Sequence, residues 1–543
     1  MPQVHDLTAE CDRDYPPPRR RRAILVVLTI NLVIAFGANS TLVVALPAIS
    51  RDFEATNSQL QWILAGYSLF LAAFILLGGQ LAERYGTRAI MGFGLLMFLG
   101  ATMAAAFVTS PDHMVIARCV MGVGGALIMP GTLMTLVQVF PPDRRASAIA
   151  IWTSFTGLAG GLGPIVSGTL LARFWPGSVF LILVPLVIAS LIGVGVVVPR
   201  MPGSIHQRID LFGTLLSLTG IGLLVYSLIN AQHVGWLVPQ TLITITVALA
   251  LLALFIAWQR AAKNPLLALD QFSDARFSVG FGMMMMVFVA YYGVLYVSLL
   301  WLQTALDYSP LESALALLPY AVVVMALTPA TPKIVNLLGG RLTAVVASGF
   351  CALGFGSFLL LDAHSSYYMF GISVTVFSIG MSLIVPLTTS LVMTASAESS
   401  RSGGAAAMTN ISRDLGNALG VAVFGSLAVT AYHSEIARPD ADRAEATYSS
   451  PIAALADIRS IMPAETMNQA VAHIQRAYTT GFHWVAVAGA IVSLVALLVA
   501  TVFLRSKYSV SPTVCVNEVK PSMSSPSLDE VPSCKRENKT PIE

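Results

Sequence analysis

Charged residues are scarce in this chain. Only 11% of its 543 residues are Asp, Glu, Lys or Arg, and 56% are hydrophobic. A typical soluble domain has about 25% charged residues, so this composition excludes an ordinary soluble fold. The 31 basic and 28 acidic residues leave a net charge of only +3, which gives no reason to expect a nucleic-acid partner.

Motifs for metal, nucleotide or covalent chemistry are also missing. The five cysteines lack the spacing of a zinc site or a disulfide framework: Cys11, Cys119, Cys351, Cys515 and Cys534. The sequence contains no Gly-x4-Gly-Lys-Ser/Thr loop, no His/Cys/Glu cluster and no nucleophile elbow. We therefore expect no cofactor and no metal, and predict neither an enzyme nor an ATP-driven pump.

Long apolar runs fill most of the sequence, each of about 20 residues or more, which suffices to cross a hydrocarbon core of ~30 Å. The pattern predicts an all-α polytopic membrane protein. Its 14 expected spans are 23–47, 59–82, 88–108, 113–138, 147–171, 177–198, 209–231, 239–259, 277–304, 311–335, 341–361, 366–396, 403–432 and 477–505.

The basic residues predict the orientation of these spans. Residues 1–22 form a tail that ends in four arginines, which should stay in the cytoplasm, and most of the other Lys and Arg then also fall on the cytoplasmic side. An even number of spans returns the C-terminus to the cytoplasm. We expect 433–476 to be an extracellular loop and 508–543 to be a disordered cytoplasmic tail.

An internal repeat divides the chain. Three groups recur in order roughly 250 residues later: Gly86-Thr87-Arg88 as Gly339-Gly340-Arg341, Met129-Pro130 as Val385-Pro386, and Arg145, Thr153 and Gly160 as Arg401, Thr409 and Gly416. The repeat predicts two pseudo-symmetric six-helix bundles, at 23–198 and 277–505, with two inserted helices at 209–259. Such halves usually face each other across a site near the middle of the bilayer.

A short polar turn separates the second and third spans. Its residues are Gly79-Gln80-Leu81-Ala82-Glu83-Arg84-Tyr85-Gly86-Thr87-Arg88. A positive cytoplasmic loop alone explains the arginines but not the whole pattern. The run resembles the loop between helices 2 and 3 of the major facilitator superfamily, with Glu83 in the usual Asp place. The resemblance implies a cytoplasmic gate in which Gly79, Glu83, Arg84, Gly86 and Arg88 take part.

Further motifs over about residues 30–430 extend this resemblance. They are Asn39-Ser40-Thr41 to Pro47, Trp62-x4-Tyr67, Arg118-x3-Gly122-Val123-Gly124-Gly125-Ala126, Gly157-x5-Gly163-Pro164-x3-Gly168, Asp210-Leu211-Phe212-Gly213 and Tyr308-Ser309-Pro310. Together they resemble the 14-helix drug:proton antiporters of the EmrB/QacA type. This implies the major facilitator fold and, from the helix 5 pattern, an exporter.

Small residues in helix 5 favour close helix contacts. Gly157, Gly161, Gly163, Pro164 and Gly168 either pack statically or, as the resemblance implies, form a pivot between the halves. The repeat has its own pair, Gly416 and Gly420, in helix 13. Packing at a pseudo-symmetric interface is the interpretation that both pairs share.

Arg118 is a candidate for proton coupling, because a charge within a span is a functional candidate. The resemblance also places the helix 4 arginine in coupling. Two positions depart from the family pattern: Met121 stands where Gln is frequent, and Asn39 stands where similar proteins usually carry Asp. Asn cannot titrate, so simple antiport is in question.

A polar stripe in helix 13 offers a substitute. Asn410, Arg413, Asp414 and Asn417 follow three- and four-residue spacing on an otherwise small, apolar helix. Arg413 and Asp414 are either a structural ion pair or coupling groups, with Asp414 the one acid expected near the middle of the membrane. Asn39, Trp62, Tyr67, Asn410 and Asn417 are candidates for the wall of a substrate cavity.

The sequence therefore predicts a secondary active exporter of amphipathic small molecules that works by alternating access and is coupled to protons. The alternatives are a transport-deficient receptor or sensor with the same fold, which Asn39 and Met121 favour, and an uncoupled facilitator. The expected partners are a small-molecule substrate, protons and the lipid bilayer. We expect a monomer in the cell membrane, of the bacterial inner or plasma membrane type.

Overall fold

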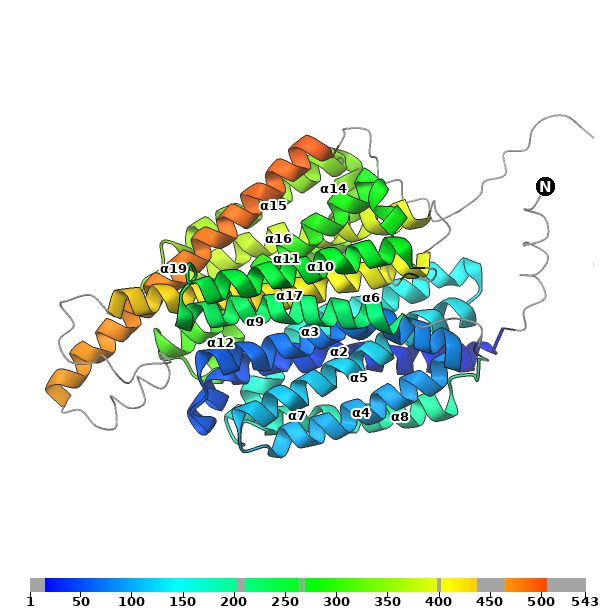
Figure 1. Cartoon of the computed structure of the whole chain (residues 1–543), viewed down its shortest axis with the longest axis horizontal. Helices are drawn as coiled ribbons and strands as arrows, with labels where there is room; N and C mark the ends of the chain where they lie inside the picture. Colours follow the sequence, from blue (N-terminus) through cyan, green and yellow to red (C-terminus); the bar gives the residue numbers. More distant parts are fainter. Residues whose placement is uncertain are drawn as a thin grey trace, which may run out of the picture. The chain divides into compact units, whose positions relative to one another are not determined.

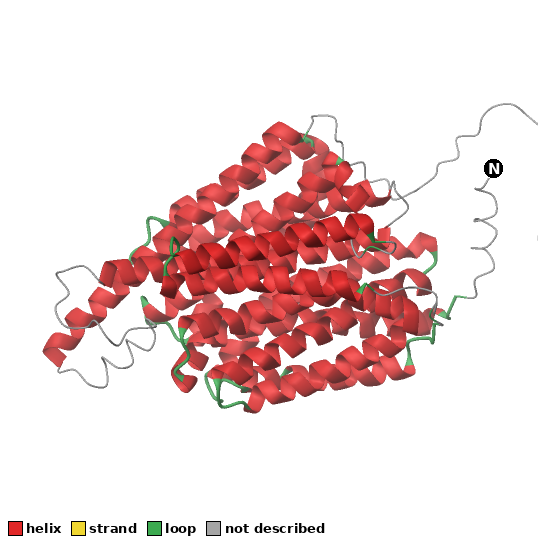
Figure 2. Ribbon diagram, in the orientation of Figure 1, coloured by secondary structure: helices red, strands yellow, loops and turns green. Residues whose placement is uncertain are grey.

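Helices make up nearly all of the chain that can be described. The computed structural model describes residues 15–201, 203, 210–262, 265, 269–397, 402–436 and 464–504, and no strand occurs among them (Figure 2). The predicted tail at 508–543 lies outside these residues, as does most of the predicted loop at 433–476.

The helices fall into two halves and an inserted pair (Figure 1). The N-terminal half consists of α2 (Pro18–Phe53), α3 (Asn57–Tyr85), α4 (Thr87–Phe107), α5 (Pro111–Val139), α6 (Pro142–Leu171), α7 (Ser178–Leu181) and α8 (Leu183–Val196). The inserted pair is α9 (Leu211–Val234) and α10 (Pro239–Ala261). The C-terminal half consists of η1 (Leu269–Ser273), α11 (Ala275–Thr304), α12 (Pro310–Ala316), α13 (Leu318–Leu327), η2 (Thr328–Ala330), α14 (Thr331–Leu338), α15 (Gly340–Phe358), α16 (Tyr367–Ala397), α17 (Ser402–Ile436) and α19 (Ala464–Phe503).

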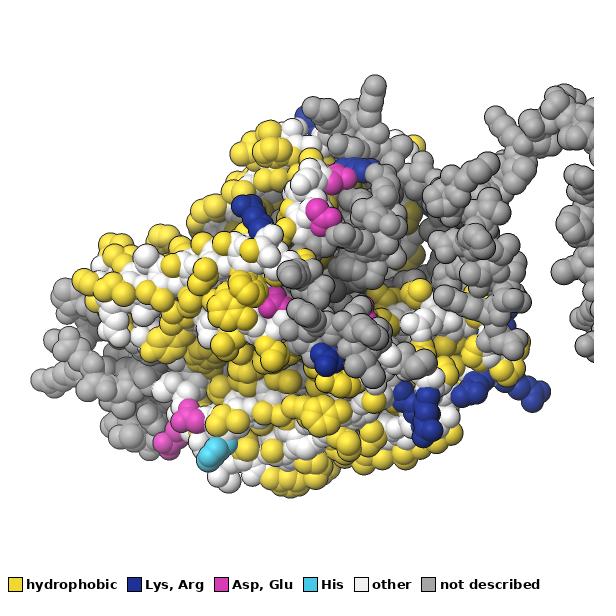
Figure 3. Space-filling model, turned by 45° about the vertical axis from the view of Figure 1, so that its right-hand side comes forward, with side chains coloured by type: hydrophobic (Ala, Val, Ile, Leu, Met, Phe, Trp, Pro, Cys, Tyr) yellow, Lys and Arg dark blue, Asp and Glu magenta, His cyan; other side chains and the backbone are white. Residues whose placement is uncertain are grey.

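The helices are long and apolar enough for a multi-pass membrane protein. Thirteen candidate spans occur within the described residues, and α6 adds a 30-residue helix whose Leu162–Leu171 part is apolar. Hydrophobic side chains cover most of the described surface in Figure 3. Short turns join most consecutive spans, so neighbours run in opposite directions. We call the two ends of the bundle the Phe53 end, where α2 stops and α3 begins, and the Tyr85 end, where α3 stops and α4 begins.

Some predicted boundaries differ from the structure. The arginines at 19–22 belong to the first turns of α2 rather than to a separate tail, and Arg20 Nε donates to the Val197 carbonyl (3.2 Å). Residues 464–476, expected in a loop, continue α19 as helix. The span predicted at 311–335 is a series of short helices, because Pro319, Pro329 and Pro332 each remove a backbone donor.

The turns that start α4 and α15 share an unusual backbone. Gly86 ends α3 with φ +92° and ψ 136°, and Gly339 ends α14 with φ +82° and ψ 155°. Glycine adopts a positive φ without steric cost, which explains why both turns carry it. Pro130 in α5 and Pro386 in α16 also hold equivalent interior positions. These pairs match the predicted repeat.

Glycines bring helices together in the same way within each half. A Cβ at Gly163 of α6 would collide with Ser40 of α2, and a Cβ at Gly420 of α17 would collide with the Val289 carbonyl of α11. Gly416 repeats the contact, since its Cβ would lie 2.7 Å from Phe288 Cβ. Gly163 and the pair Gly416 and Gly420 thus make contacts inside their own halves, while the surroundings of Gly157 and Gly161, the predicted counterparts of that pair, lie outside the described part of the structure.

The inserted pair is held at the Tyr85 end by Asp210. Its side chain caps α9 by accepting from the Gly213 N–H (2.8 Å), and it also accepts from Trp258 Nε1 (3.0 Å) and Gln259 Nε2 (2.9 Å) of α10. The Asp210 N–H donates to Gln80 Oε1 (3.1 Å) of α3. The Asp-Leu-Phe-Gly run therefore ties both inserted helices to the N-terminal half.

Toward the Phe53 end α9 contacts both halves. Gln232 Nε2 of α9 donates to Ser58 Oγ of α3 (2.6 Å), while Ser426 Oγ of α17 donates to the Leu228 carbonyl of α9 (2.7 Å). Trp236, just after α9, donates to Thr430 Oγ1 of α17 (3.2 Å). Figure 1 shows α9 beside α3 and α17. The helix covers the seam between the halves at this end.

Direct contacts between the halves also lie at mid-depth and toward the Phe53 end. Gln303 Nε2 of α11 donates to the Val44 carbonyl of α2 (3.3 Å), and Tyr296 Oη donates to Asn57 Oδ1 of α3 (3.4 Å). Gly168 of α6 packs directly on the backbone of α12. In this conformation the halves are therefore closed against each other at the Phe53 end.

A candidate central cavity and its polar network

Arg118 is completely buried in the N-terminal half. Its Nε donates to the Ile63 carbonyl (3.0 Å), its Nη1 to the Ala38 carbonyl (3.0 Å) and its Nη2 to Asn39 Oδ1 (2.8 Å). The guanidinium also lies over the Tyr67 ring, 4.5 Å from its centroid. Three neutral oxygens and one ring therefore hold the guanidinium inside the protein, and each of its three nitrogens has a hydrogen-bond acceptor.

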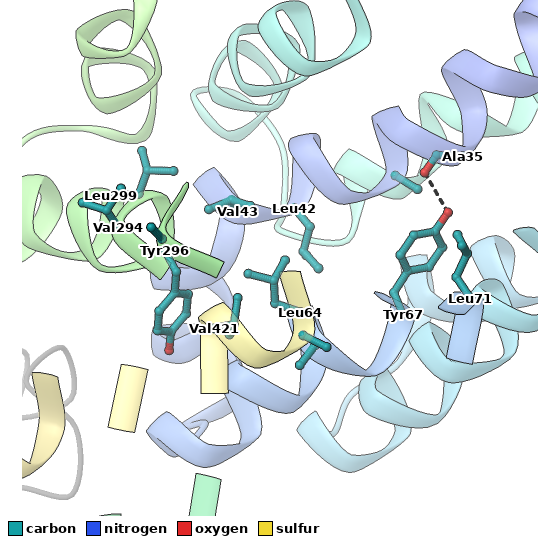
Figure 4. Close-up of a cluster of buried hydrophobic side chains, with 14 of the residues drawn as sticks. Ala35, Leu42, Val43, Leu64, Tyr67, Leu71, Val294, Tyr296, Leu299 and Val421 are labelled. Carbon is teal, nitrogen blue, oxygen red and sulfur yellow. Dashed lines mark hydrogen bonds between the residues drawn. The ribbon is translucent and has the colours of Figure 1, made fainter. Parts of the chain in front are cut away.

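Tyr67, whose ring lies against the Arg118 guanidinium, is itself held by a hydrogen bond. Its hydroxyl donates to the Ala35 carbonyl of α2 (2.7 Å), the bond dashed in Figure 4. The same figure shows side chains from α2, α3, α11 and α17 gathered in one apolar cluster, among them Leu42, Val294 and Val421. The fully buried Met121, where the family often has Gln, adds an apolar side chain to the surroundings.

Ser68 links the Arg118 site to the C-terminal half. Asn39 Nδ2 of α2 donates to Ser68 Oγ (3.2 Å), and Asn417 Nδ2 of α17 donates to the same oxygen (2.6 Å). One hydroxyl thus joins α2, α3 and α17. Ser68 was not predicted from the sequence, where the only sign of its role is a hydroxyl directly after Tyr67 in an apolar run.

Arg413 and Asp414 do not pair with each other. Arg413 Nη2 donates to Asn410 Oδ1 (2.6 Å), one turn earlier on α17, and its guanidinium lies 4.3 Å from the Phe36 ring centroid and 5.8 Å from that of Phe288. Its Nε is buried and has no hydrogen-bond partner. Consecutive helical residues point about 100° apart, which separates the two side chains. The structural ion pair considered from the sequence is not formed.

Asp414 is buried, with 8% of its surface exposed. It makes no hydrogen bond or ion pair with a described residue. Besides Arg413, the phenol groups of Tyr67 and Tyr292 are close enough to interact with it electrostatically. Asp414 is thus a carboxyl group inside the membrane-spanning region with no fixed partner in this conformation.

A cavity of about 580 Å³ lies between the halves. Residues of α2, α6, α11, α12, α13, η2, α15, α16 and α17 line it, most of them apolar. Its aromatic residues are Phe36, Phe155, Phe288, Tyr291, Tyr292, Tyr320, Phe358 and Phe377. Pockets for drug-sized ligands usually measure about 300–1,000 Å³ and have mainly apolar walls, so this cavity has the size and character of such a site.

The five predicted cavity residues do not line this space. Asn39, Tyr67 and Asn417 belong to the polar network beside it, and Asn410 holds Arg413. Trp62 packs against the apolar core. These polar residues satisfy one another's hydrogen bonds beside the cavity, and their contact with a substrate stays a prediction.

Tyr291 and Tyr292 of α11 line the cavity. The neighbouring methionines at 283–286 do not. The wall residues that sequence reasoning missed include Phe36, Tyr320 and Phe377, which stand in ordinary apolar runs and carry no local signal.

The predicted gate motif lies at the turn from α3 to α4. A Cβ at Gly86 would lie only 2.7 Å from the Met201 carbonyl, so this turn is covered by the chain that leaves α8. Arg88 donates to the Val198 carbonyl (3.2 Å) and to the Gly195 carbonyl. These bonds join α4 to the end of α8, within one half.

The remaining residues of the gate motif are Gly79, Glu83 and Arg84. Glu83 is exposed and makes no hydrogen bond or ion pair with a described residue. The Arg84 guanidinium lies 5.4 Å from the Tyr85 ring centroid. Gly79 approaches Pro130 of α5, where an added Cβ would stay at 3.8 Å. The predicted gate contact of Glu83 is not formed with any described residue in this conformation.

The glycines and the proline predicted for the fifth span, 147–171, all lie in α6, but they make different contacts. Gly157 and Gly161 are helical, and their surroundings lie outside the described part of the structure. Pro164 lines the cavity. Gly163 contacts α2 of the same half, whereas Gly168 contacts Leu311 of the other half. A pivot between the halves would have to contact both of them, and of these residues only Gly168 contacts the other half.

A comparison with known protein families agrees with this fold and its repeated halves. The sequence model described as Major Facilitator Superfamily matches residues 28–421. This chain belongs to the Major Facilitator Superfamily. Among the described residues of this superfamily member, no group of three or more His, Cys, Asp or Glu side chains is arranged to hold a metal ion.

Curated relatives are similar over most of the chain. The multidrug efflux pump LfrA of Mycolicibacterium smegmatis is 30% identical over 491 residues, 90% of this chain and 97% of the relative. The methyl viologen resistance protein SmvA of Salmonella typhimurium is 29% identical over 496 residues, 90% of this chain and 99% of the relative. The multidrug resistance protein Stp of Mycobacterium tuberculosis is 29% identical over 428 residues, 78% and 79% of the two chains.

Solved structures share the fold at low sequence identity. A bacterial homologue of the human lysosomal transporter Spinster, in an inward-facing and unoccupied conformation, superposes with a TM-score of 0.62 at 16% identity. The match covers 89% of this chain and 98% of that structure. At this identity the likeness concerns the fold alone.

Proposed function

We propose that this protein is a secondary active exporter that moves amphipathic small molecules out of the cytoplasm and is driven by protons. The observation that carries the proposal is a drug-sized aromatic cavity between two halves that are closed at the Phe53 end. Relatives named for multidrug efflux and drug resistance support export. No catalytic role is proposed for any residue.

Orientation follows from the basic residues of the sequence. The four arginines at 19–22 lie at the Tyr85 end. We place this end, together with both termini, on the cytoplasmic side of the cell membrane. In this proposal the Phe53 end faces outside, and the halves are closed on that side. Alternating access requires the contacts at the Phe53 end to break while contacts form at the Tyr85 end.

Asp414 is the proton carrier in this proposal. Arg118 donates only to neutral oxygens, and its closest side-chain acceptor, Asn39, cannot titrate. Asp414 is a buried carboxyl group without a fixed partner on α17, the helix that Asn417 ties to Ser68. It can bind and release a proton as the halves move.

Proton movement in proteoliposomes tests this role. Asp414→Asn is expected to abolish proton movement driven by substrate, and Asp414→Glu to retain part of it. Asp52→Asn removes an exposed carboxylate at the end of α2 and serves as the control. Asn39→Asp in the Asp414→Asn background returns an acid to Arg118 and should restore some coupling. Proton exchange at the parent rate by Asp414→Asn would make Asp414 structural only.

A receptor or sensor is the second candidate, because Asn39 and Met121 depart from the family pattern. An uncoupled facilitator is the third. An efflux assay with a panel of dyes and antibiotics in a pump-deficient host separates them. Saturable, energy-dependent efflux supports an exporter, binding without turnover supports a receptor, and flux that only follows the concentration gradient supports a facilitator.

A further inference from the structure

One charged side chain faces the central cavity. Among the described lining residues, Arg413 alone carries a charge at neutral pH, while the polar groups of Ser40, Ser298 and Thr328 and the phenols of the wall are neutral. Asp414 is next in sequence but is not part of the lining. Arg413 is therefore the charged side chain that a molecule in the cavity would contact directly.

Arg413 forms no ion pair with a described residue, although the Asp414 carboxyl, which lies outside the lining, is close enough to interact with it electrostatically. Its one hydrogen bond goes to the neutral Asn410 side chain, and its buried Nε has no partner. A guanidinium has five N–H donors, and only the Nη2 group has a described hydrogen-bond acceptor. The Phe36 and Phe288 rings hold the group in place without supplying an acceptor.

Such a cation discriminates between ligands by their charge. A carboxylate or phenolate in the cavity would gain charge-assisted hydrogen bonds, which are stronger than neutral ones. A cationic ligand would instead place a like charge beside an already desolvated guanidinium, which is repulsive. Phe36 and Phe288, the two rings against the guanidinium, already interact with Arg413 itself.

The rest of the wall suits a flat ring system. Tyr291 stacks on Tyr320 with ring centroids 5.1 Å apart at 20°, and lies nearly parallel to Phe377 at 6.4 Å and 8°. Near-parallel rings from α11, α13 and α16 form one aromatic surface on the cavity wall. Offset stacking on such a surface is favourable for aromatic ligands.

We propose that the cavity takes aromatic molecules that carry an acidic group, with Arg413 binding the acid and the Tyr291 ring surface binding the aromatic part. This substrate class rests on the proposed exporter function and makes it narrower. Arg413 is then the residue that determines specificity, and organic cations are poor ligands of this cavity.

Three naphthalene probes of the same size test the proposal: 2-naphthoate, 2-naphthamide and 2-naphthylmethylammonium. Their binding to the purified full-length protein in lipid nanodiscs is measured by calorimetry without any gradient. We expect 2-naphthoate to bind about tenfold to a hundredfold more tightly than the amide, the range for hydrogen bonds to charged groups. The ammonium probe should bind most weakly.

Variants assign the preference to one side chain. Arg413→Gln should remove the advantage of 2-naphthoate over 2-naphthamide, and Arg413→Lys should keep part of it. Arg341→Gln removes an exposed arginine at the start of α15 and should leave the ranking unchanged. Size-exclusion profiles check that each variant is folded, and the ranking in the parent protein needs no variant.

Two results would overturn the proposal. One is an ammonium probe that binds the parent as tightly as 2-naphthoate, and the other is an unchanged naphthoate preference in folded Arg413→Gln. Failure of all three probes to bind would also contradict an aromatic acid site. Since binding is measured without transport, these results are separate from the efflux assay that tests the exporter function itself.

Discussion

Gly168 provides a direct way to test how the two halves move. It is buried on α6 near the Phe53 end, where a Cβ would lie 2.8 Å from Leu311 Cα and 3.1 Å from the Pro310 carbonyl oxygen of α12. Both neighbours are backbone atoms, which cannot rotate away. Gly168→Ala therefore forces α6 and α12 apart in the closed conformation.

The cost of this substitution applies to one conformation only. Inserting a methyl group into a well-packed contact costs about 1–3 kcal/mol. The contact is lost when the Phe53 end opens, so the equilibrium should shift toward that state by about 5- to 150-fold. Alanine also improves helix propensity by about 1 kcal/mol, but it does so in both conformations and leaves the ratio unchanged.

Spin labels at the Phe53 end can measure this shift. Cysteines replacing the exposed Asp52 in the N-terminal half and Ser366 in the C-terminal half would carry the labels in nanodiscs. The distance distribution of Gly168→Ala should gain a longer component. Gly100→Ala on α4, where a Cβ meets nothing within 4 Å, is the matched control. A distribution identical to the parent and the control would refute the assignment of Gly168 to the moving contact.

Two further predictions concern the gate and the topology. Glu83→Ala should raise the labelling of cysteines placed at the Tyr85 end, since the acid is expected to hold that end closed in the outward-open state; Arg88→Ala should act in the same direction by freeing α4 from the end of α8. Asp52→Ala at the opposite end is the control, and unchanged labelling would contradict the gate. A tag inserted near Ser449-Ser450 should react with impermeant reagents in intact cells, and labelling only after permeabilisation would mean that a span was miscounted.

The sequence alone determined the fold class. A run long enough to cross the bilayer is a local property, so apolar length fixed the spans, and the glycine and proline positions of the repeat fixed the halves. Gly86 and Gly339 show why this worked: each tight turn needs a positive φ wherever the rest of the chain lies.

Only the tertiary structure decided which side chains face the cavity. Arg413 and Asp414 are adjacent polar residues of one helix, and their sequence cannot say which of two directions about 100° apart points inward. Phe36, Tyr320 and Phe377 look like any ring in an apolar span, yet the rotation of their helices turns them to the same space. That rotation is set by glycine contacts and by bonds such as Asn417 to Ser68, which join residues far apart in the chain.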